Sequence, residues 1–149
     1  MTGYLLSTKA IYEFVQGEEC EAQDFWSWAQ GLSRNDELYV SEISLGELWS
    51  AVDQLSGPLR RHWDHCLEKV IPGRFGARLL PFRRDDALQW GLIRQQSDPL
   101  LPAEEEMIIG QAISRNLTFV GPTTPAHVQF NCTTLDPYNG TPWPGADFG

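Results

Sequence analysis

The sequence contains no long hydrophobic run. No apolar stretch approaches the ~20 residues that a helix needs to cross a bilayer, and residues Met1 to Tyr4 lack the basic start and the apolar core of a secretory signal. We therefore expect a cytoplasmic protein that does not enter a membrane.

Cysteine is scarce as well. Cys20, Cys66 and Cys132 are widely spaced and odd in number, which is typical of free thiols in a reducing compartment and argues against a disulfide framework. His62, His65 and Cys66 lie three and four residues apart on a predicted helix, so one face could offer metal ligands. No second ligand pair lies nearby in the sequence, and we favour a polar helix face at this position.

Positive charge is also in short supply. Eleven Lys and Arg residues stand against 20 Asp and Glu residues, which gives a formal net charge of −9. Such a surface repels nucleic acid on average, so an RNA site would need a local basic patch or bound cations. The chain also has no Gly-rich phosphate loop and no nucleophile elbow, so the sequence points to no particular small-molecule ligand.

A length of 149 residues with 42% hydrophobic content is enough for one domain with a proper core. Short apolar runs alternate with amphipathic stretches, and this alternation predicts a parallel sheet with helices on both faces. We expect strands at 4–6, 37–40, 77–82, 117–120 and 128–135, and helices at 10–15, 21–32, 44–55, 59–70, 86–96 and 102–113. The domain is assigned to 1–138, and 139–149 is a Gly/Pro-rich C-terminal tail without a regular element.

Several short blocks follow one another in a characteristic order and spacing. They are Leu5-Leu6-x-Thr8, Ser41 to Leu48, Arg78 to Phe82, Ala87 with Trp90-Gly91, Leu101-Pro102 followed by an acidic residue and Met107-Ile108, Leu117 to Val120, and Asp136-Pro137-Tyr138. Together they resemble the PIN-domain family, and most closely the VapC-like toxins of bacterial toxin-antitoxin pairs, over residues 4–138. The resemblance implies an α/β fold, a three-layer α/β/α PIN-like domain with a central parallel sheet.

The resemblance also implies a chemistry. Proteins of this family are Mg²⁺- or Mn²⁺-dependent endoribonucleases whose carboxylates come from four separated segments and meet at the C-terminal edge of the sheet. Hard divalent cations prefer oxygen ligands, and metal-bound water becomes a usable nucleophile near neutral pH. A chain that has lost some of these carboxylates is therefore expected to lose activity.

Two of the four acidic positions are altered. Ser7 stands where the family has its first Asp, and Lys9 stands where it usually has Asn. At the fourth position the usual Thr-Arg-Asn or Thr-Arg-Asp is replaced by Gly121-Pro122-Thr123, so Thr123 takes the place of the Asn or Asp. We therefore interpret Ser7, Lys9 and Thr123 as degenerate family positions.

The other two positions keep an acid. Glu47 matches the acidic residue of the family's second helix, and Glu105 matches the third position, with Glu104 and Glu106 as register alternatives. By this resemblance Glu47 and Glu105 are the catalytic candidates and, if a metal ion is bound, its candidate ligands.

Each surviving acid also has a structural interpretation. Ser44 and Glu47 fit a capping box at the start of a helix, a stabilisation of about 0.5–2 kcal/mol. Glu104 to Glu106 lie in the first turn of a helix opened by Pro102, where the macrodipole favours negative charge by about 0.3–1 kcal/mol each. If the first strand extends to Lys9, the ammonium group of Lys9 enters the pocket where the family holds its metal ion. We then expect Lys9 to pair with Glu47 or Glu105 and to take the place of that ion.

Two functional interpretations follow. In the first, the chain is a VapC-like protein of nuclease ancestry with impaired or lost endoribonuclease activity, which acts by binding an antitoxin-like protein or another protein and needs no cofactor. In the second, it is an active Mg²⁺- or Mn²⁺-dependent endoribonuclease toxin that binds RNA with a rearranged acidic site. The resemblance further implies a homodimer through the segment 44–70. The apolar residues of this segment belong either to the core or to the interface, and both assignments stay open: Leu48, Trp49, Val52, Leu55, Leu59 and Trp63.

Overall fold

The computed structural model describes residues 2–96, 101–124, 126–127 and 130–138. Within this part of the chain, five parallel strands form one sheet in the order β3-β2-β1-β4-β5. Leu5 at the centre of the sheet pairs with Tyr39 on one side and Phe119 on the other. The strands are β1 (Gly3–Leu6), β2 (Glu37–Ser41), β3 (Leu79–Leu80), β4 (Thr118–Val120) and β5 (Thr134–Leu135). The predicted parallel sheet is confirmed.

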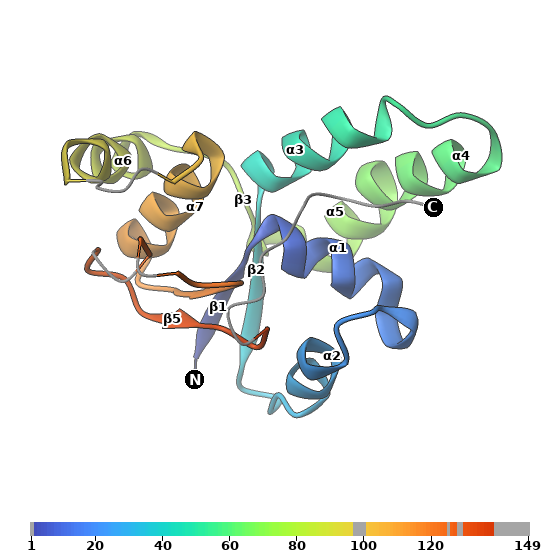
Figure 1. The fold of residues 1–149 in the computed structure, drawn as a ribbon, viewed down its shortest axis with the longest axis horizontal. Coiled ribbons are helices and arrows are strands. Elements are labelled where there is room, and N and C mark those ends of the chain that lie inside the picture. Colours follow the sequence, from blue (N-terminus) through green and yellow to red (C-terminus); the bar gives the residue numbers. More distant parts are fainter. Residues whose placement is uncertain (1, 97–100, 125, 128–129, 139–149) are drawn as a thin grey trace.

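Helices cover both faces of this sheet, as Figure 1 shows, so the predicted α/β/α layering is also confirmed. On one face lie α6 (Arg84–Gln96) and α7 (Ala103–Ser114). Around the other are α1 (Thr8–Gln16), α2 (Gln23–Gln30), α3 (Glu42–Val52), α4 (Gly57–His65) and α5 (Ile71–Phe75), with the short turns η1 (Gly17–Glu19), η2 (Cys66–Val70) and η3 (Gly76–Arg78). None of the described helices is both long and apolar enough to span a membrane.

Two adjacent leucines of β1 belong to two separate hydrophobic cores. Successive side chains of a strand point to opposite faces, so Leu6 packs with α1 to α5 and Leu5 packs with α6 and α7. Both leucines are fully buried. The first core includes Ile11, Phe25, Leu48, Val52, Trp63 and Ile71, and the second includes Ile93, Ile108, Ile109 and Phe119.

The end predicted for the helix at 59–70 is wrong. After α4 the chain continues through the π-helical turn η2, in which the N–H of Ile71 donates to the Cys66 carbonyl five residues back, and then through α5 to Phe75. Pro72 lies in the first turn of α5, where a missing N–H costs nothing. The helix ends instead at Gly76, whose φ of 54° favours glycine.

Two predicted strands are shorter than expected. The strand predicted at 77–82 is reduced to Leu79–Leu80, because Gly76–Arg78 forms the 3₁₀ turn η3. Of the strand predicted at 128–135, the structure has Thr134–Leu135, while residues 128–129 lie outside the described residues. The tail 139–149 also lies outside them.

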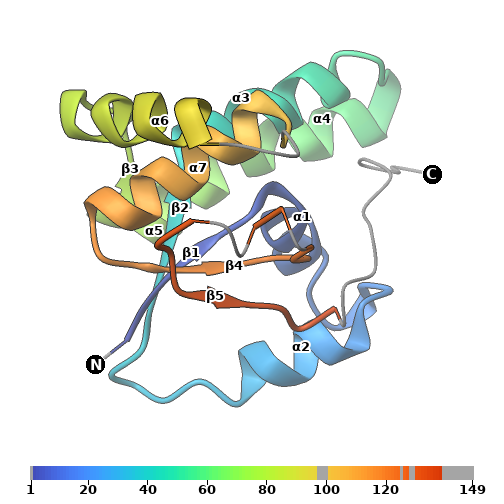
Figure 2. The same ribbon diagram turned by 60° about the vertical axis from the view of Figure 1, so that its left-hand side comes forward.

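Helices α6 and α7 lie side by side (Figures 1 and 2), and Gly110 of α7 packs tightly against the backbone of α6. A Cβ atom at Gly110 would lie 3.1 Å from the Trp90 backbone nitrogen and 3.2 Å from the Asp86 carbonyl oxygen. These neighbours are backbone atoms of α6, so they cannot move aside as a flexible side chain would. The hairpin therefore requires glycine at this position.

We expect Gly110→Ala to lower the free energy of unfolding by about 1–3 kcal/mol, because the added methyl group pushes α7 away from α6. Urea unfolding followed by circular dichroism measures this change. Gly91→Ala is the matched control, since no atom lies within 4 Å of its Cβ position and alanine favours the helix by about 0.5–1 kcal/mol. A Gly110→Ala variant as stable as Gly91→Ala would contradict the close-packing argument.

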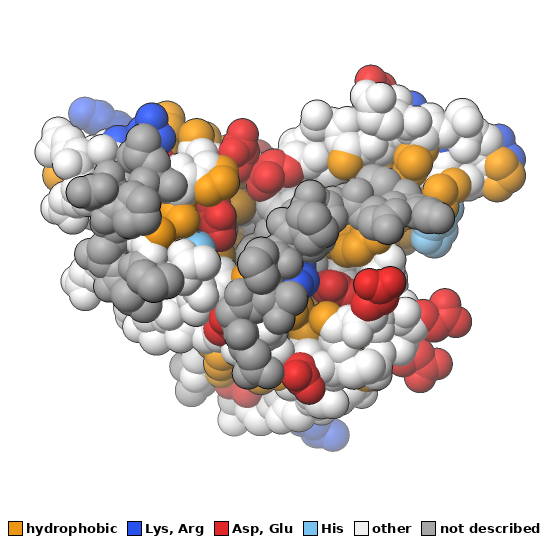
Figure 3. Space-filling view, in the orientation of Figure 1, with side chains coloured by type: hydrophobic (Ala, Val, Ile, Leu, Met, Phe, Trp, Pro, Cys, Tyr) orange, Lys and Arg blue, Asp and Glu red, His pale blue; other side chains and the backbone are white. Residues whose placement is uncertain are grey.

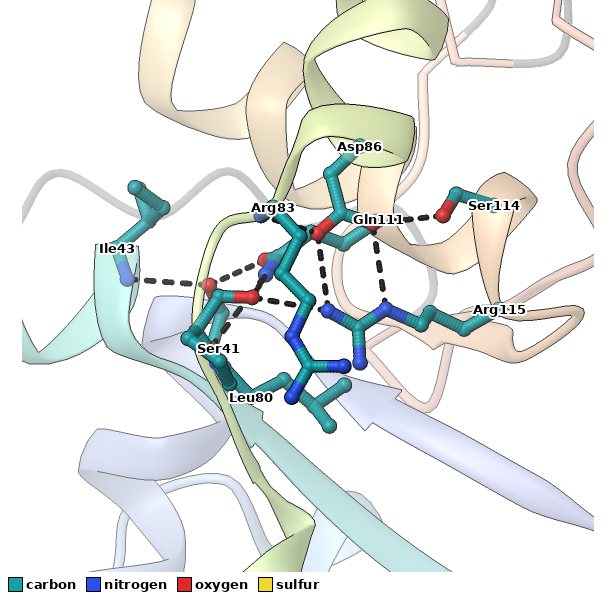
Figure 4. A network of polar contacts seen from close by, with 9 residues as sticks. Ser41, Ile43, Leu80, Arg83, Asp86, Gln111, Ser114 and Arg115 are labelled. Carbon is teal, nitrogen blue, oxygen red and sulfur yellow. Dashed lines mark hydrogen bonds and ion pairs between the residues drawn. The ribbon is translucent and has the colours of Figure 1, made fainter.

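A buried polar network joins this hairpin to the sheet (Figure 4). The fully buried Asp86 carboxylate accepts hydrogen bonds from Ser114 Oγ at 2.7 Å, from Arg115 Nη2 at 2.9 Å and from the Arg83 N–H at 2.8 Å. Gln111 of α7 accepts from Ser41 Oγ at the end of β2 and donates to the Leu80 and Pro81 carbonyls of the β3 segment. The network therefore fixes α7 against the ends of β2 and β3.

Candidate functional site

The parallel strands end at one edge of the sheet, and Ser7 lies there directly after β1. Its Oγ accepts a hydrogen bond from the Ala10 N–H at 3.2 Å and so caps helix α1. A Cβ atom at Gly121 would lie 2.6 Å from Ser7 Oγ, so the loop after β4 passes close to this side chain only because residue 121 is glycine. Ser7, which the sequence analysis predicts to stand in place of the family's first Asp, thus serves as a helix cap.

The prediction for Lys9 is wrong. β1 ends at Leu6 because Ser7 caps α1, so Lys9 lies in the helix and not on the strand. Its Nζ lies 4.1 Å from the centre of the Tyr138 ring, and Glu13 and Asp136 attract it. The ion pairs of the described residues include none between Lys9 and Glu47 or Glu105.

The capping box predicted from Ser44 and Glu47 is also wrong. Helix α3 begins two residues earlier than expected, and Ser41 caps it by accepting from the Ile43 N–H at 3.0 Å. Ser44 is buried inside the helix, with its Oγ 3.1 Å from Thr8 Oγ1. Glu47 therefore makes no cap and projects from the middle of α3.

Glu47 faces the first turns of α1 and α7. Thr8 Oγ1 donates a hydrogen bond to Glu47 Oε1 at 2.5 Å. Burial raises the pKa of Glu47 above its usual 4.5; the Thr8 hydrogen bond opposes this shift, and the negative charges of Glu104 and Glu105 add to it. The structure thus brings Glu47 together with Glu104 and Glu105, residues nearly 60 positions away in the sequence.

Because the pKa of Glu47 is raised, replacing this residue should stabilise the folded protein, and the size of the effect should depend on pH. A carboxyl group whose pKa is higher in the folded state destabilises that state when it is ionised, above the raised pKa, and has no such effect below pH 4.5. We expect Glu47→Gln, which still accepts from Thr8, to raise the melting temperature near neutral pH and to match wild type below pH 4.5. Glu42→Gln, at an exposed position in the same helix, is the control. A lower melting temperature for Glu47→Gln near neutral pH would refute the argument.

The three glutamates at the start of α7 have different environments. Glu106 is fully buried and its Oε1 lies 2.6 Å from Arg94 Nη1 of α6, so it points into the α6–α7 hairpin. Glu105 Oε1 lies 2.6 Å from His127 Nε2. Figure 3 shows acidic side chains gathered beside the hollow between α7 and α3. The register alternative that remains beside Glu105 is therefore Glu104.

His127 is a site residue that the sequence analysis missed. It lies in the loop after β4, its side chain is 3% exposed, and its ring stacks on Phe119 with the ring centres 5.8 Å apart. The Thr124 N–H donates to His127 Nδ1 at 2.9 Å. The available signal was the position of the loop, since loops that follow parallel strands line the C-terminal edge of the sheet.

Thr123, predicted to replace the family's fourth acidic residue, contacts Asp136. Its N–H donates to Asp136 Oδ2 at 3.0 Å, and its Oγ1 lies 3.3 Å from the same oxygen. Asp136 follows β5 and also accepts from the Tyr138 N–H at 2.7 Å. The carboxylate beside Thr123 thus comes from Asp136, and internal donors hold it next to Lys9.

The donor set does not fit a Mg²⁺ or Mn²⁺ ion as the fold family would hold it. Glu47 and Glu105 each direct an oxygen at a hydrogen-bond donor of the chain, Thr8 and His127 respectively. Over the described ranges, no group of three or more His, Cys, Asp or Glu side chains is arranged to hold a metal ion. His62 and Cys66 are in contact, with Nε2 and Sγ 3.8 Å apart, but they form no such group with His65.

Comparison with solved structures places this geometry in a known fold. The FitAcB structure from Neisseria gonorrhoeae matches with a TM-score of 0.77 and 24% identity, over 91% of this chain and 99% of the other. VapBC2 from Rickettsia felis, bound to a DNA fragment from their promoter, matches with a TM-score of 0.70 and 17% identity over 91% and 98%. VapBC-5 from Mycobacterium tuberculosis, of the VapBC family of toxin-antitoxin systems, gives 0.60 and 14% over the same shares.

These structures confirm the predicted PIN-like α/β/α fold, the fold of toxin-antitoxin PIN-domain proteins. Neither the known protein families nor the curated proteins contain a match to the sequence itself. The fold is thus recognisable where the sequence has diverged.

Proposed function

We propose that this chain is a VapC-like PIN-domain protein of nuclease ancestry whose metal-dependent endoribonuclease activity is impaired or lost, and that it acts through binding another protein. The observation that carries the proposal is the state of the acidic site. Ser7 caps a helix where the family has a carboxylate, and the two retained acids, Glu47 and Glu105, accept hydrogen bonds from within the chain. The scaffold around these residues is intact, so the fold has been kept without its usual set of ligands.

An antitoxin-like protein is the proposed partner. Structures with this fold come from the toxin-antitoxin system VapBC-5 and from a VapBC2 complex with promoter DNA. A retained PIN-like surface would serve such a partner even without RNA cleavage. The proposed homodimer would use exposed apolar side chains of the predicted segment 44–70, namely Trp49, Leu59 and Val70, whereas Leu48, Val52 and Trp63 belong to the core. A cytoplasmic location stays a prediction.

Co-expression tests the partner directly. The neighbouring genes are inspected for a small upstream reading frame with a DNA-binding pattern, and its product is expressed together with this chain. We expect a stable complex on size-exclusion chromatography with light scattering, which resolves homodimer from heteromer. Two separate peaks for chain and candidate partner would contradict the proposed antitoxin-like interaction.

An active, rearranged endoribonuclease is the second candidate function. The observation that favours it is the convergence of Glu47, Glu104 and Glu105, whose negative charges interact across the C-terminal edge of the sheet. One or two carboxylates hold Mg²⁺ when substrate phosphate and water complete its shell. This function would need RNA as a substrate and Mg²⁺ or Mn²⁺ as a cofactor, and it differs from the first in requiring Glu47 for activity.

A further inference from the structure

The imidazole of His127 is held in one orientation by contacts on three sides. Its Nδ1 accepts from the Thr124 N–H at 2.9 Å and lies 3.0 Å from Thr124 Oγ1. One ring face stacks on the fully buried Phe119. The third contact is Nε2 to Glu105 Oε1 at 2.6 Å. Only 3% of its side chain is exposed, so the protein encloses the ring.

These contacts define which nitrogen carries the proton. A backbone N–H can only donate, so Nδ1 must be the acceptor, and the neutral ring then carries its proton on Nε2. That Nε2–H points at the Glu105 carboxylate. A hydrogen bond to a charged group is shorter and stronger than one between neutral groups, and the distance of 2.6 Å fits such a bond.

We infer that His127 is a positioning residue that holds Glu105 in an internal hydrogen bond and so keeps this carboxylate from coordinating a divalent cation. Thr8 makes a comparable bond to Glu47, but a hydroxyl group rotates freely about its C–O bond, whereas the His127 ring is fixed by Thr124 and Phe119. The inference rests on the proposed function, because it names the side chain that stands between a retained acid and a metal ion.

The test is His127→Phe in the full chain, with Mn²⁺ as the probe. Phenylalanine keeps the ring volume and the stacking on Phe119 but has no N–H for Glu105. We expect isothermal titration calorimetry to give an affinity for Mn²⁺ about tenfold higher than that of wild type, which corresponds to about 1.4 kcal/mol. Adding Glu105→Gln to this variant should return the affinity to the wild-type value. His65→Phe, at an exposed position on α4, should leave it unchanged.

A folded His127→Phe variant with the wild-type affinity for Mn²⁺ would overturn the inference. If circular dichroism shows that this variant does not fold, nitrogen-15 NMR of the wild-type His127 ring decides. The inference requires a neutral ring protonated at Nε2, with resonances that Mn²⁺ does not broaden. Broadening of these resonances by Mn²⁺ would overturn the inference, because Mn²⁺ would then bind beside Glu105 while His127 is in place. RNA cleavage by wild type would instead contradict the proposed function, so the two failures are distinguishable.

Discussion

Replacing Asp86 by alanine should lower the free energy of unfolding by about 3 kcal/mol, because it leaves the guanidinium of Arg115 without its carboxylate partner in a largely buried position. Ser114 Oγ and the Arg83 N–H lose an acceptor at the same time. The change also removes the side-chain hydrogen bonds that join α7 to the start of α6, although Gln111 still bonds to the β3 segment. Urea unfolding followed by circular dichroism measures the difference.

Asp85→Ala is the matched control for this variant. Asp85 is the preceding residue of α6 and is exposed, so its removal should cost no more than the ~1 kcal/mol of a favourable charge in the first helical turn. Equal losses in Asp86→Ala and Asp85→Ala would show that the buried network does not stabilise the hairpin.

The Asp86 network also makes the free energy of unfolding depend on pH. Burial alone would raise the pKa of Asp86, but the hydrogen bonds from Arg115, from the Arg83 N–H and from Ser114 outweigh it and lower the pKa below the usual 3.8. A carboxyl group with a lowered pKa stabilises the fold above its ordinary pKa and loses this contribution as the pH falls through the lowered value. The difference in free energy of unfolding between wild type and Asp86→Ala should therefore become smaller below pH 3.8.

Restoring the family residues should produce a metal-dependent ribonuclease. We expect the triple variant Ser7→Asp, Thr123→Asn, His127→Phe to cleave RNA with Mg²⁺ or Mn²⁺ about 100-fold faster than wild type or more, the range in which a positioned acid or base contributes. Ser7→Asp preserves the fold, since aspartate caps a helix as well as serine does. Thr123→Asn keeps the backbone N–H that donates to Asp136. Cleavage of a labelled RNA, read on a gel, measures the gain.

The double variant Ser7→Asp, Thr123→Asn is the control for this gain. It carries the two restored family residues while Glu105 is still held by His127. It should cleave more slowly than the triple variant. A triple variant that is folded but inactive would show that the lost activity has another cause than these three positions.

The resemblance implied that Glu47 and Glu105 meet, and the structure brings them close enough for their charges to interact. The parallel sheet accounts for part of this, because parallel strands end at one edge and the helix starts that follow β1 and β2 lie together there. The hydrophobic periodicity was likewise sufficient for the layers, because Leu5 and Leu6 must face opposite cores. These features depend on local patterns that a single sequence contains.

The errors arose where two local signals competed. Ser44 fitted a capping box, but Ser41 caps α3 because β2 ends there and Ser44 is needed inside the core. The pairing predicted for Lys9 required the first strand to extend to this residue, whereas the cap made by Ser7 ends β1 at Leu6, a contact that periodicity does not reveal. His127 carries no local pattern, and its role depends on where the loop after β4 passes in space.

Cleavage of RNA by the wild-type chain, with Mg²⁺ and with Mn²⁺, is the most direct test of the central claim. It is measured beside Glu47→Ala, which retains the scaffold but removes the acid that any residual site would need. The account predicts that neither wild type nor Glu47→Ala cleaves the RNA. Cleavage by wild type that disappears in Glu47→Ala would contradict it and would establish an active site built from the acids that remain.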